Sequence, residues 1–429
     1  MKIYKIFGRL GPAFVVGACI IGPGSVTLMS KTGALYGYSM LWLSVLTGAL
    51  TCGFMTLFMR FAICSDETFL DVARRKLGRV FALIAGVSVA STNAAFQFGN
   101  CLGVTAGMNM FIKDLPQQVW PIAFTTAAVL FLFTFKRIYR IIEKMMSALL
   151  MLMLAAFAVN MVSARPNVLH AAKGICVPVI PNNVDWVTIG GLVATTFALT
   201  AVIFQSYAVK AKGWTQKDWA SGLTDTLTAS LVFTLIGMVI MTTAAAVLFD
   251  RGIKVDSAAA MALQLEKVFG RFAGIIFGIG FSAAAFSSFI VNSLMGAVLL
   301  NDALGLGGKL DSKPTKIFAA VVLLTGMVTS LVIIGYKPPA DASVQAVGGF
   351  AADPKVIALA IGQAATLLAV PFGTVATVVV LFDKRWRKGR RLSIWTQGLV
   401  MFGAAVLLAI AIMMYVKLES IVTKIFAGA

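Results

Sequence analysis

A Gly22-Pro23-Gly24-Ser25 sequence interrupts the first long apolar segment of this chain near its middle. Proline lacks a backbone N–H and clashes with the preceding helical turn, and glycine relaxes the backbone, so a helix that crosses this sequence must unwind. Unpaired backbone groups are costly in hydrocarbon and are tolerated only where protein or a water-lined cavity satisfies them. The interruption therefore predicts a broken membrane helix with a substrate site at the break.

The composition places the chain in a lipid bilayer. Of its 429 residues, 59% are hydrophobic and 12% are charged, and the mean hydropathy is +0.91, which together exclude a soluble globular domain. We therefore expect an all-α polytopic membrane protein. Segments of about 20 apolar residues predict about eleven spans, near residues 11–31, 39–62, 79–111, 118–135, 145–163, 187–209, 222–249, 268–300, 317–335, 356–382 and 394–416.

The distribution of basic residues predicts the topology. Two thirds of the 36 Lys and Arg residues fall on one set of alternate connections, which is the cytoplasmic set if the N-terminus lies inside and the C-terminus outside. The net charge of +19 is spread over short loops, so we expect contact with anionic lipids and no binding to nucleic acid. The short loops and the absence of a targeting presequence predict a prokaryotic plasma (inner) membrane, and we expect a monomer.

A second break is predicted in span six. Thr195, Thr196 and Thr200 cluster within a few turns, which is polar for a helix that faces lipid. Such hydroxyls can instead bond to carbonyls one turn earlier, which would be a purely structural role. Spans one and six stand five spans apart, where two inverted five-helix repeats would each begin with a discontinuous helix. The pairing therefore favours a shared site at the two breaks.

Three stretches near the N-terminus resemble one family of transporters. Gly11-Pro12-Ala13-Phe14, the break at residues 22–25 and the sequence KTGALYGYSMLW at residues 31–42 together resemble the first-span region of the Nramp family of metal-ion transporters. The resemblance implies a LeuT-type fold in which helices 1 and 6 are discontinuous. It implies one transporter domain over residues 1–429, with five-helix repeats at 1–163 and 187–382 and an additional C-terminal helix at 394–429, that works by alternating access.

The residues that hold the metal in that family are missing from this chain. The family's first-span Asp and Asn fall at Gly22 and Ser25, and its sixth-span Met falls near Leu199 or Thr200. The break thus offers neither carboxylate nor sulfur, although hard dications prefer carboxylates and soft ones gain from sulfur or imidazole. The one histidine, His170, lies in a predicted outer loop. We therefore expect neither a metal site nor a proton relay.

Backbone amides and hydroxyls are what remains at the predicted site. Because helix N-termini favour negative charge, we expect a small inorganic anion, with bicarbonate as the first choice. Lys31, just past the break, would either concentrate the anion at the outer mouth or anchor a helix end at the membrane interface. The predicted substrate-binding residues are Gly22, Pro23, Gly24, Ser25, Thr195, Thr196, Ala198, Leu199, Thr200 and Gln363, with a secondary set of Asn93, Gln97, Lys31 and Asn292.

Two alternatives stay open. In the first, the chain moves a divalent metal ion, Mg²⁺ or Mn²⁺, through carbonyl and hydroxyl oxygens and without proton coupling. In the second, it is a receptor that kept the fold and transports nothing. We expect no enzyme, because one histidine and acids confined to loops assemble no catalytic arrangement. We expect no cofactor, and sodium co-transport stays open because Na⁺ needs only carbonyl and hydroxyl oxygens.

Overall fold

The first apolar segment forms two helices that meet at a sharp bend. The computed structural model describes residues 11–135, 141–142, 144–146, 148, 158–182, 184–335, 370–387, 389 and 392–427. In it, α2 (Pro12–Ile20) and α3 (Pro23–Tyr36) are bent by 57° at the break. Each helix begins with a proline in its first turn, where the missing N–H would have no intrahelical partner. The predicted break in helix 1 is therefore confirmed.

The sixth predicted span is also divided. α10 (Trp186–Thr196) ends two residues before α11 (Leu199–Lys212) begins, and Phe197 and Ala198 between them have non-helical backbone angles. Asp185 caps the start of α10 by accepting hydrogen bonds from the N–H groups of Val187 and Thr188. Both discontinuous helices thus lie where the sequence predicts them.

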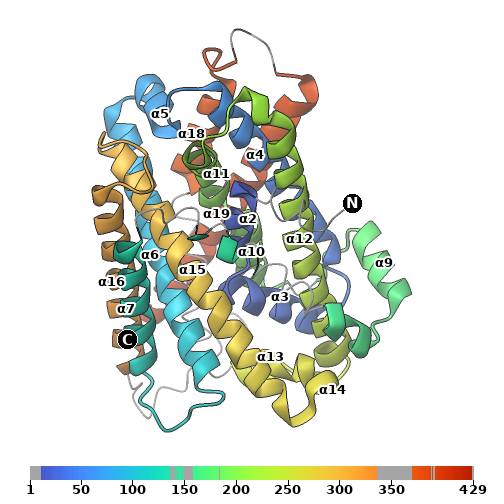
Figure 1. Cartoon of the computed structure of the whole chain (residues 1–429). Helices are drawn as coiled ribbons and strands as arrows, with labels where there is room; N and C mark the ends of the chain where they lie inside the picture. Colours follow the sequence, from blue (N-terminus) through green and yellow to red (C-terminus); the bar gives the residue numbers. More distant parts are fainter. Residues whose placement is uncertain are drawn as a thin grey trace.

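The remaining helices enclose these two broken ones. They are α4 (Leu41–Cys64), α5 (Phe69–Leu77), α6 (Arg79–Met108), α7 (Val119–Thr134), α9 (Val168–Cys176), α12 (Trp219–Ala244), α13 (Ala258–Ala262), α14 (Glu266–Phe269), α15 (Ala273–Ala303), α16 (Lys313–Gly335), α18 (Val370–Phe382) and α19 (Ile394–Ala427). In Figure 1, α2 and α10 lie near the centre, with α6, α7, α15 and α16 on one side and α4 and α12 on the other. The same view places α5 and α18 at one end of the bundle and α13 and α14 at the opposite end.

The helices have the lengths and apolar character of membrane spans. Within the described residues, seven helical stretches are long and apolar enough to cross a bilayer, and the bent pair α2 and α3 makes an eighth. The apolar helices α7 and α18 are shorter. Predicted span five and the first half of predicted span ten lie largely outside the described residues. The all-α polytopic fold is confirmed, while the count of eleven and the repeat boundaries stay predictions.

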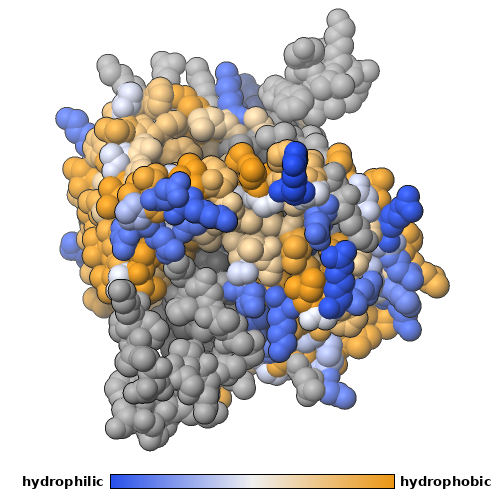
Figure 2. All heavy atoms as spheres, turned by 90° about the horizontal axis from the view of Figure 1, so that it is seen from below, coloured by the Kyte–Doolittle hydropathy of each residue, from blue (hydrophilic) through white to orange (hydrophobic). Residues whose placement is uncertain are grey.

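The outward face of α16 shows how the bundle meets lipid. Its exposed residues Ile317, Val321, Leu324, Val328 and Val332 follow helical spacing along one side, which is the arrangement expected of a helix that faces hydrocarbon. Figure 2 shows the end of the bundle that carries α13 and α14, where hydrophilic side chains occur in separate groups among apolar ones. That distribution fits a protein whose ends, and not its flanks, meet water.

A buried carboxylate holds the free end of α2. Asp225 of α12 accepts hydrogen bonds from the N–H of Gly11 at 2.6 Å and from the N–H of Ala13 at 2.9 Å. These N–H groups belong to the helix start, where no intrahelical carbonyl can reach them. The contact ties the first half of the broken helix to a continuous one.

We expect Asp225→Ala to destabilise the protein by about 2–4 kcal/mol, because two buried N–H groups lose their acceptor at once. Unfolding in mixed micelles, followed by tryptophan fluorescence, measures the change in the free energy of unfolding. Asp218→Ala, which removes a carboxylate from an exposed turn, is the control and should cost about 1 kcal/mol or less. Equal decreases in the free energy of unfolding of the two variants would show that the contact between Asp225 and α2 does not stabilise the protein more than an exposed cap does.

Candidate binding site at the two breaks

A cavity lies where the two broken helices face each other, and we call it the break cavity. Its lining combines both breaks with one wall of two unbroken helices. The lining residues are Cys19, Ile20, Gly22, Gly24 and Ser25 from α2, α3 and their junction, Thr195, Ala198, Thr200 and Ala201 from α10, α11 and their junction, Phe96 and Asn100 from α6, and Ser288, Asn292 and Met295 from α15. Seven of these were predicted from the sequence, namely Gly22, Gly24, Ser25, Thr195, Ala198, Thr200 and Asn292.

The backbone at each break presents groups of both signs to this cavity. The last carbonyls of α2 and α10 and the first N–H groups of α3 and α11 lack intrahelical partners, as at any helix end. No side chain of the described residues caps the start of α3 or of α11. A bound ion could therefore meet carbonyl oxygens from one helix half and amide hydrogens from the other.

The hydroxyl groups around the breaks donate their hydrogens to nearby carbonyls. Ser25 donates to the carbonyl of Ile20, and Thr195 donates to that of Leu192 at 3.1 Å. Thr196 donates to the same carbonyl at 2.6 Å. This is the local bonding that the sequence left open as the alternative for these residues. Because a hydroxyl has one hydrogen and two lone pairs, Ser25 and Thr195 in this arrangement have lone pairs left to present to the cavity.

The described lining of the break cavity contains sulfur but no carboxylate or imidazole. Asp, Glu and His are absent from its lining, and no group of three His, Cys, Asp or Glu gathers anywhere in the described part of the chain. Cys19 and Met295, by contrast, both line the cavity, and the Cys19 thiol donates to Asn292 Oδ1 at 2.6 Å. The expectation that the break offers no sulfur is therefore wrong, because Cys19 stands just before the break and Met295 reaches it from α15.

Other predicted site residues lie outside the break cavity. Pro23 packs against α6, where a Cβ on Gly103 would come within 2.5 Å of its ring. Thr196 turns towards α4, and its carbonyl accepts a hydrogen bond from Thr51 at 2.8 Å. Gln363 lies outside the described residues.

The predicted secondary residues Asn93 and Gln97 serve the packing of α6. Asn93 donates to the carbonyl of Val89 at 2.8 Å and lies against Gly296 of α15. Gln97 lies against Gly326 of α16 and accepts a hydrogen bond from Asn100 Nδ2 at 3.3 Å. Neither lines the break cavity.

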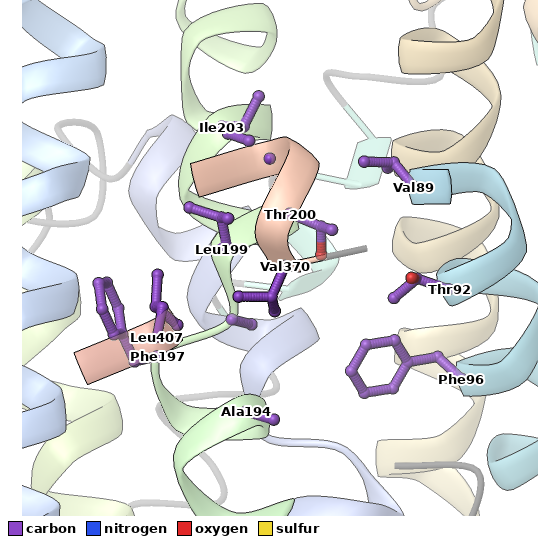
Figure 3. Close-up of a pocket in the computed structure, with 12 residues that line it drawn as sticks. Val89, Thr92, Phe96, Ala194, Phe197, Leu199, Thr200, Ile203, Val370 and Leu407 are labelled. Atoms are coloured by element: carbon purple, nitrogen blue, oxygen red, sulfur yellow. The ribbon is translucent and has the colours of Figure 1, made fainter. Parts of the chain in front are cut away.

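A second, largely apolar cavity adjoins the first. Leu199 lines it, and it shares Phe96, Ala198 and Thr200 with the break cavity. Figure 3 shows Thr92 and Phe96 of α6 on one side and Thr200 and Val370 on the other. Its remaining lining is apolar apart from Thr92, so its surroundings suit packing or passage better than tight binding of an ion.

Lys31 forms a buried ion pair and is not among the residues that line the break cavity. Its side chain is 4% exposed, and its Nζ lies 3.0 Å from Asp185 Oδ2. Asp185 is also the residue that caps α10, and its N–H donates to the Tyr36 hydroxyl at 2.6 Å. The pair therefore joins the second half of broken helix 1 to the first half of broken helix 6. This contact is a structural role for Lys31 that was not considered from the sequence.

Polar contacts also close the opposite end of the bundle. Arg75 of α5 pairs with Glu67 at 2.8 Å and with Asp383, just after α18, at 2.6 Å. Burial by itself raises the pKa of Asp383, but hydrogen bonds from Arg75 and from the N–H of Arg385 bring it below its usual value. Tyr207 of α11 donates to Asp302 of α15 at 2.5 Å near this end. The break cavity thus lies between two sets of polar contacts.

Asn100, Ser288 and Met295 line the cavity although they were not among the predicted site residues. Ser288, Asn292 and Met295 follow a spacing of four and three residues, which places them on one face of a helix. That spacing is visible in the sequence, but other predicted spans also carry polar residues at helical spacing. Only the packing of α15 against the break selects this one.

Sequence comparisons find relatives along most of the chain. It is 23% identical over 330 residues to the divalent metal cation transporter MntH of Pectobacterium carotovorum, covering 76% of this chain and 80% of that protein. It is 23% identical over 297 residues to the MntH of Bacillus subtilis, covering 68% of this chain and 70% of that protein. These relatives are named as transporters, which agrees with the expectation that the chain is not an enzyme.

Solved structures share the fold. A crystal structure of a single-site mutant of the Eremococcus coleocola manganese transporter superposes with a TM-score of 0.78 at 16% identity, covering 96% of this chain and 87% of that one. Mhp1, a nucleobase-cation-symport-1 family transporter, superposes with a TM-score of 0.57 at 15% identity, covering 97% and 93%. The LeuT-type fold implied by the N-terminal motifs is thereby confirmed. The protein-family model described as natural resistance-associated macrophage protein-like matches residues 13–417, and the chain therefore belongs to the Nramp family of membrane transporters.

Proposed function

We propose that this chain moves a divalent metal cation, Mn²⁺ or Mg²⁺, across the membrane by alternating access through the break cavity. The observation that carries the proposal is the orientation of the hydroxyl groups. Ser25 and Thr195 give their hydrogens to carbonyls, which leaves oxygen lone pairs for a cation. The carbonyl ends of α2 and α10 add further oxygens. The names of the relatives point to the same class of substrate.

The missing carboxylate sets the expected strength of binding. A dication in a site of neutral oxygens has no protein charge to offset the hydration that it loses, so it keeps part of its water and binds weakly. The sulfur atoms of Cys19 and Met295 favour Mn²⁺ over Mg²⁺, because a softer ion gains more from thiol and thioether ligands. Among the described residues the lining contains no Asp, Glu or His, so we expect transport without proton coupling.

A small anion such as bicarbonate is the second candidate. The specific observation in its favour is that α3 and α11 both begin at the cavity without a side-chain cap, so their N–H groups remain available to negative charge. None of the relatives named above is described as an anion transporter. A receptor that transports nothing is the third candidate, and it predicts no flux of either ion. Sodium coupling, the N-inside orientation and the prokaryotic plasma membrane stay proposals from the sequence.

The test is flux into proteoliposomes that hold a divalent-sensitive dye or, in parallel, a pH dye. We expect an imposed Mn²⁺ gradient to give protein-dependent entry without a change of internal pH. Ser25→Ala, which removes the hydroxyl and adds no bulk, should lower the Mn²⁺ flux at least several-fold. Alkalinisation driven by bicarbonate, with no Mn²⁺ entry, would transfer the assignment to the anion, and silence towards both ions would favour the receptor.

A further inference from the structure

Gly22 faces the wall of the break cavity that is formed by the unbroken helices α6 and α15. A Cβ atom at residue 22 would lie 2.8 Å from Ser288 Oγ and 3.7 Å from Asn100 Oδ1. These two oxygens, from α15 and α6, therefore stand where a side chain at residue 22 would project. A side chain at residue 22 and the Ser288 hydroxyl therefore cannot occupy this space at the same time.

The Ser288 hydroxyl has no hydrogen-bond partner among the described residues. The residue is 1% exposed, it lines the cavity, and its Oγ makes no hydrogen bond within the described residues. Its neighbour Ser287 is also buried but donates to the carbonyl of Ala284 at 2.8 Å. A buried hydroxyl without a partner is unfavourable by about 1–3 kcal/mol. Among the buried polar atoms that lack a partner in the described part of the chain, Ser288 Oγ is the one whose residue lines the break cavity, so a ligand bound there would supply the partner.

Asn100 is oriented by a contact on its far side. Its Nδ2 donates to Gln97 Oε1 at 3.3 Å, which leaves Oδ1 directed towards Gly22. Gln97 in turn occupies space that a side chain at residue 326 would fill, because a Cβ on Gly326 would lie 2.6 Å from that of Gln97. Gln97 is therefore a positioning residue for the amide of Asn100.

We propose that Ser288 Oγ and Asn100 Oδ1 are direct ligands of the transported ion and take the place of the side chain that residue 22 lacks. The inference rests on the proposed function, since both atoms act as oxygen donors to a cation. In this arrangement the continuous helices α6 and α15 supply part of the ion's coordination, which the broken helix would otherwise supply. Any movement of α2 and α3 relative to these two helices then changes the ligand set and releases the ion.

Removal of the hydroxyl tests the role of Ser288. We expect Ser288→Ala to raise the KM for Mn²⁺ uptake about tenfold, with a smaller change in maximal rate, and to weaken equilibrium binding of radioactive Mn²⁺ to the detergent-purified protein by the same factor. Ser287→Ala is the matched control, because it makes the same change one residue away on a hydroxyl already bonded to its own helix. Asn100→Ala should behave like Ser288→Ala, and Asn93→Ala, which also lies on α6, should leave KM unchanged.

A change of ligand type distinguishes coordination from mere packing. Ser288→Cys places a softer atom at the same point, so the preference for Cd²⁺ over Mn²⁺ in competition uptake should rise several-fold. Ser287→Cys should leave the preference as in the wild type. An unchanged preference in Ser288→Cys, or an unchanged KM in Ser288→Ala while the wild type transports Mn²⁺, would overturn the inference and leave the proposed function standing. A wild type that neither binds nor transports Mn²⁺ overturns both.

Discussion

Gly22→Asp combined with Ser288→Ala should bind Mn²⁺ at least tenfold more tightly than the wild type. The carboxylate places a full negative charge beside the dication in a buried cavity, where Coulomb attraction is poorly screened. Gly22→Asp alone should instead lose most transport, because its Cβ would lie 2.8 Å from Ser288 Oγ. Ser288→Ala removes that oxygen and leaves the Cβ of residue 288 at 3.5 Å, which is an ordinary contact. The second substitution therefore converts a harmful change into a favourable one.

Equilibrium binding of Mn²⁺ to the purified protein measures this effect. Gly22→Asn with Ser288→Ala is the matched control, because it has nearly the same shape and no charge, and we expect no gain in affinity from it. If the two double variants bind Mn²⁺ equally, the cavity does not hold the cation. An anion carrier would respond in the opposite direction, since a carboxylate in the cavity would abolish bicarbonate transport.

The breaks could be predicted from the sequence because their cause is local. Proline between two glycines at residues 22–25 disrupts a helix whatever surrounds it, and the five-span interval to Thr195 and Thr200 repeats the pattern. The fold follows from these breaks and from the apolar segments. The seven lining residues that were predicted all lie on the breaks themselves, apart from Asn292.

The other wall of the site depends on packing that no local pattern records. Ser287 and Ser288 are adjacent and chemically identical, yet one hydroxyl bonds to its own helix and the other meets the cavity. Lys31 and Asp185 lie 154 positions apart in the sequence, so neither reveals its partner. The Cys19 sulfur was not expected at the break either, because its position in the lining depends on how α2 ends.

The charge of the substrate was harder to predict than the position of the site, because it depends on whether the hydroxyl groups offer hydrogens or lone pairs to the cavity. A list of hydroxyls and amides at a helix break suits an anion and a cation equally. The anion was preferred from the sequence because helix N-termini carry partial positive charge. In the structure the hydroxyls of Ser25 and Thr195 donate to carbonyls, and the balance of available atoms shifts towards oxygen lone pairs.

Asp185→Asn should destabilise the protein by about 3–5 kcal/mol, because it leaves the Lys31 ammonium buried without this counter-charge. Asparagine is as good a helix cap as aspartate, so the start of α10 keeps its acceptor and the loss is assigned to the ion pair. The double variant Lys31→Met with Asp185→Asn should recover much of this loss, since it leaves no charge on either member of the pair. Unfolding of the four proteins in mixed micelles forms a double-mutant cycle that gives the coupling energy directly.

The exposed pair of Arg251 and Glu266 is the control for this cycle. Its side chains are 47% and 49% exposed at 3.2 Å, so the same kind of cycle should give a coupling of about 1 kcal/mol or less. A coupling of that size for Lys31 and Asp185 would mean that the pair is solvated and does not bind the broken helices together. A coupling several times larger means that the second half of helix 1 and the first half of helix 6 move as one body. In the proposed alternating-access cycle, that body would then be displaced as a unit against α6 and α15, the helices that carry Asn100 and Ser288.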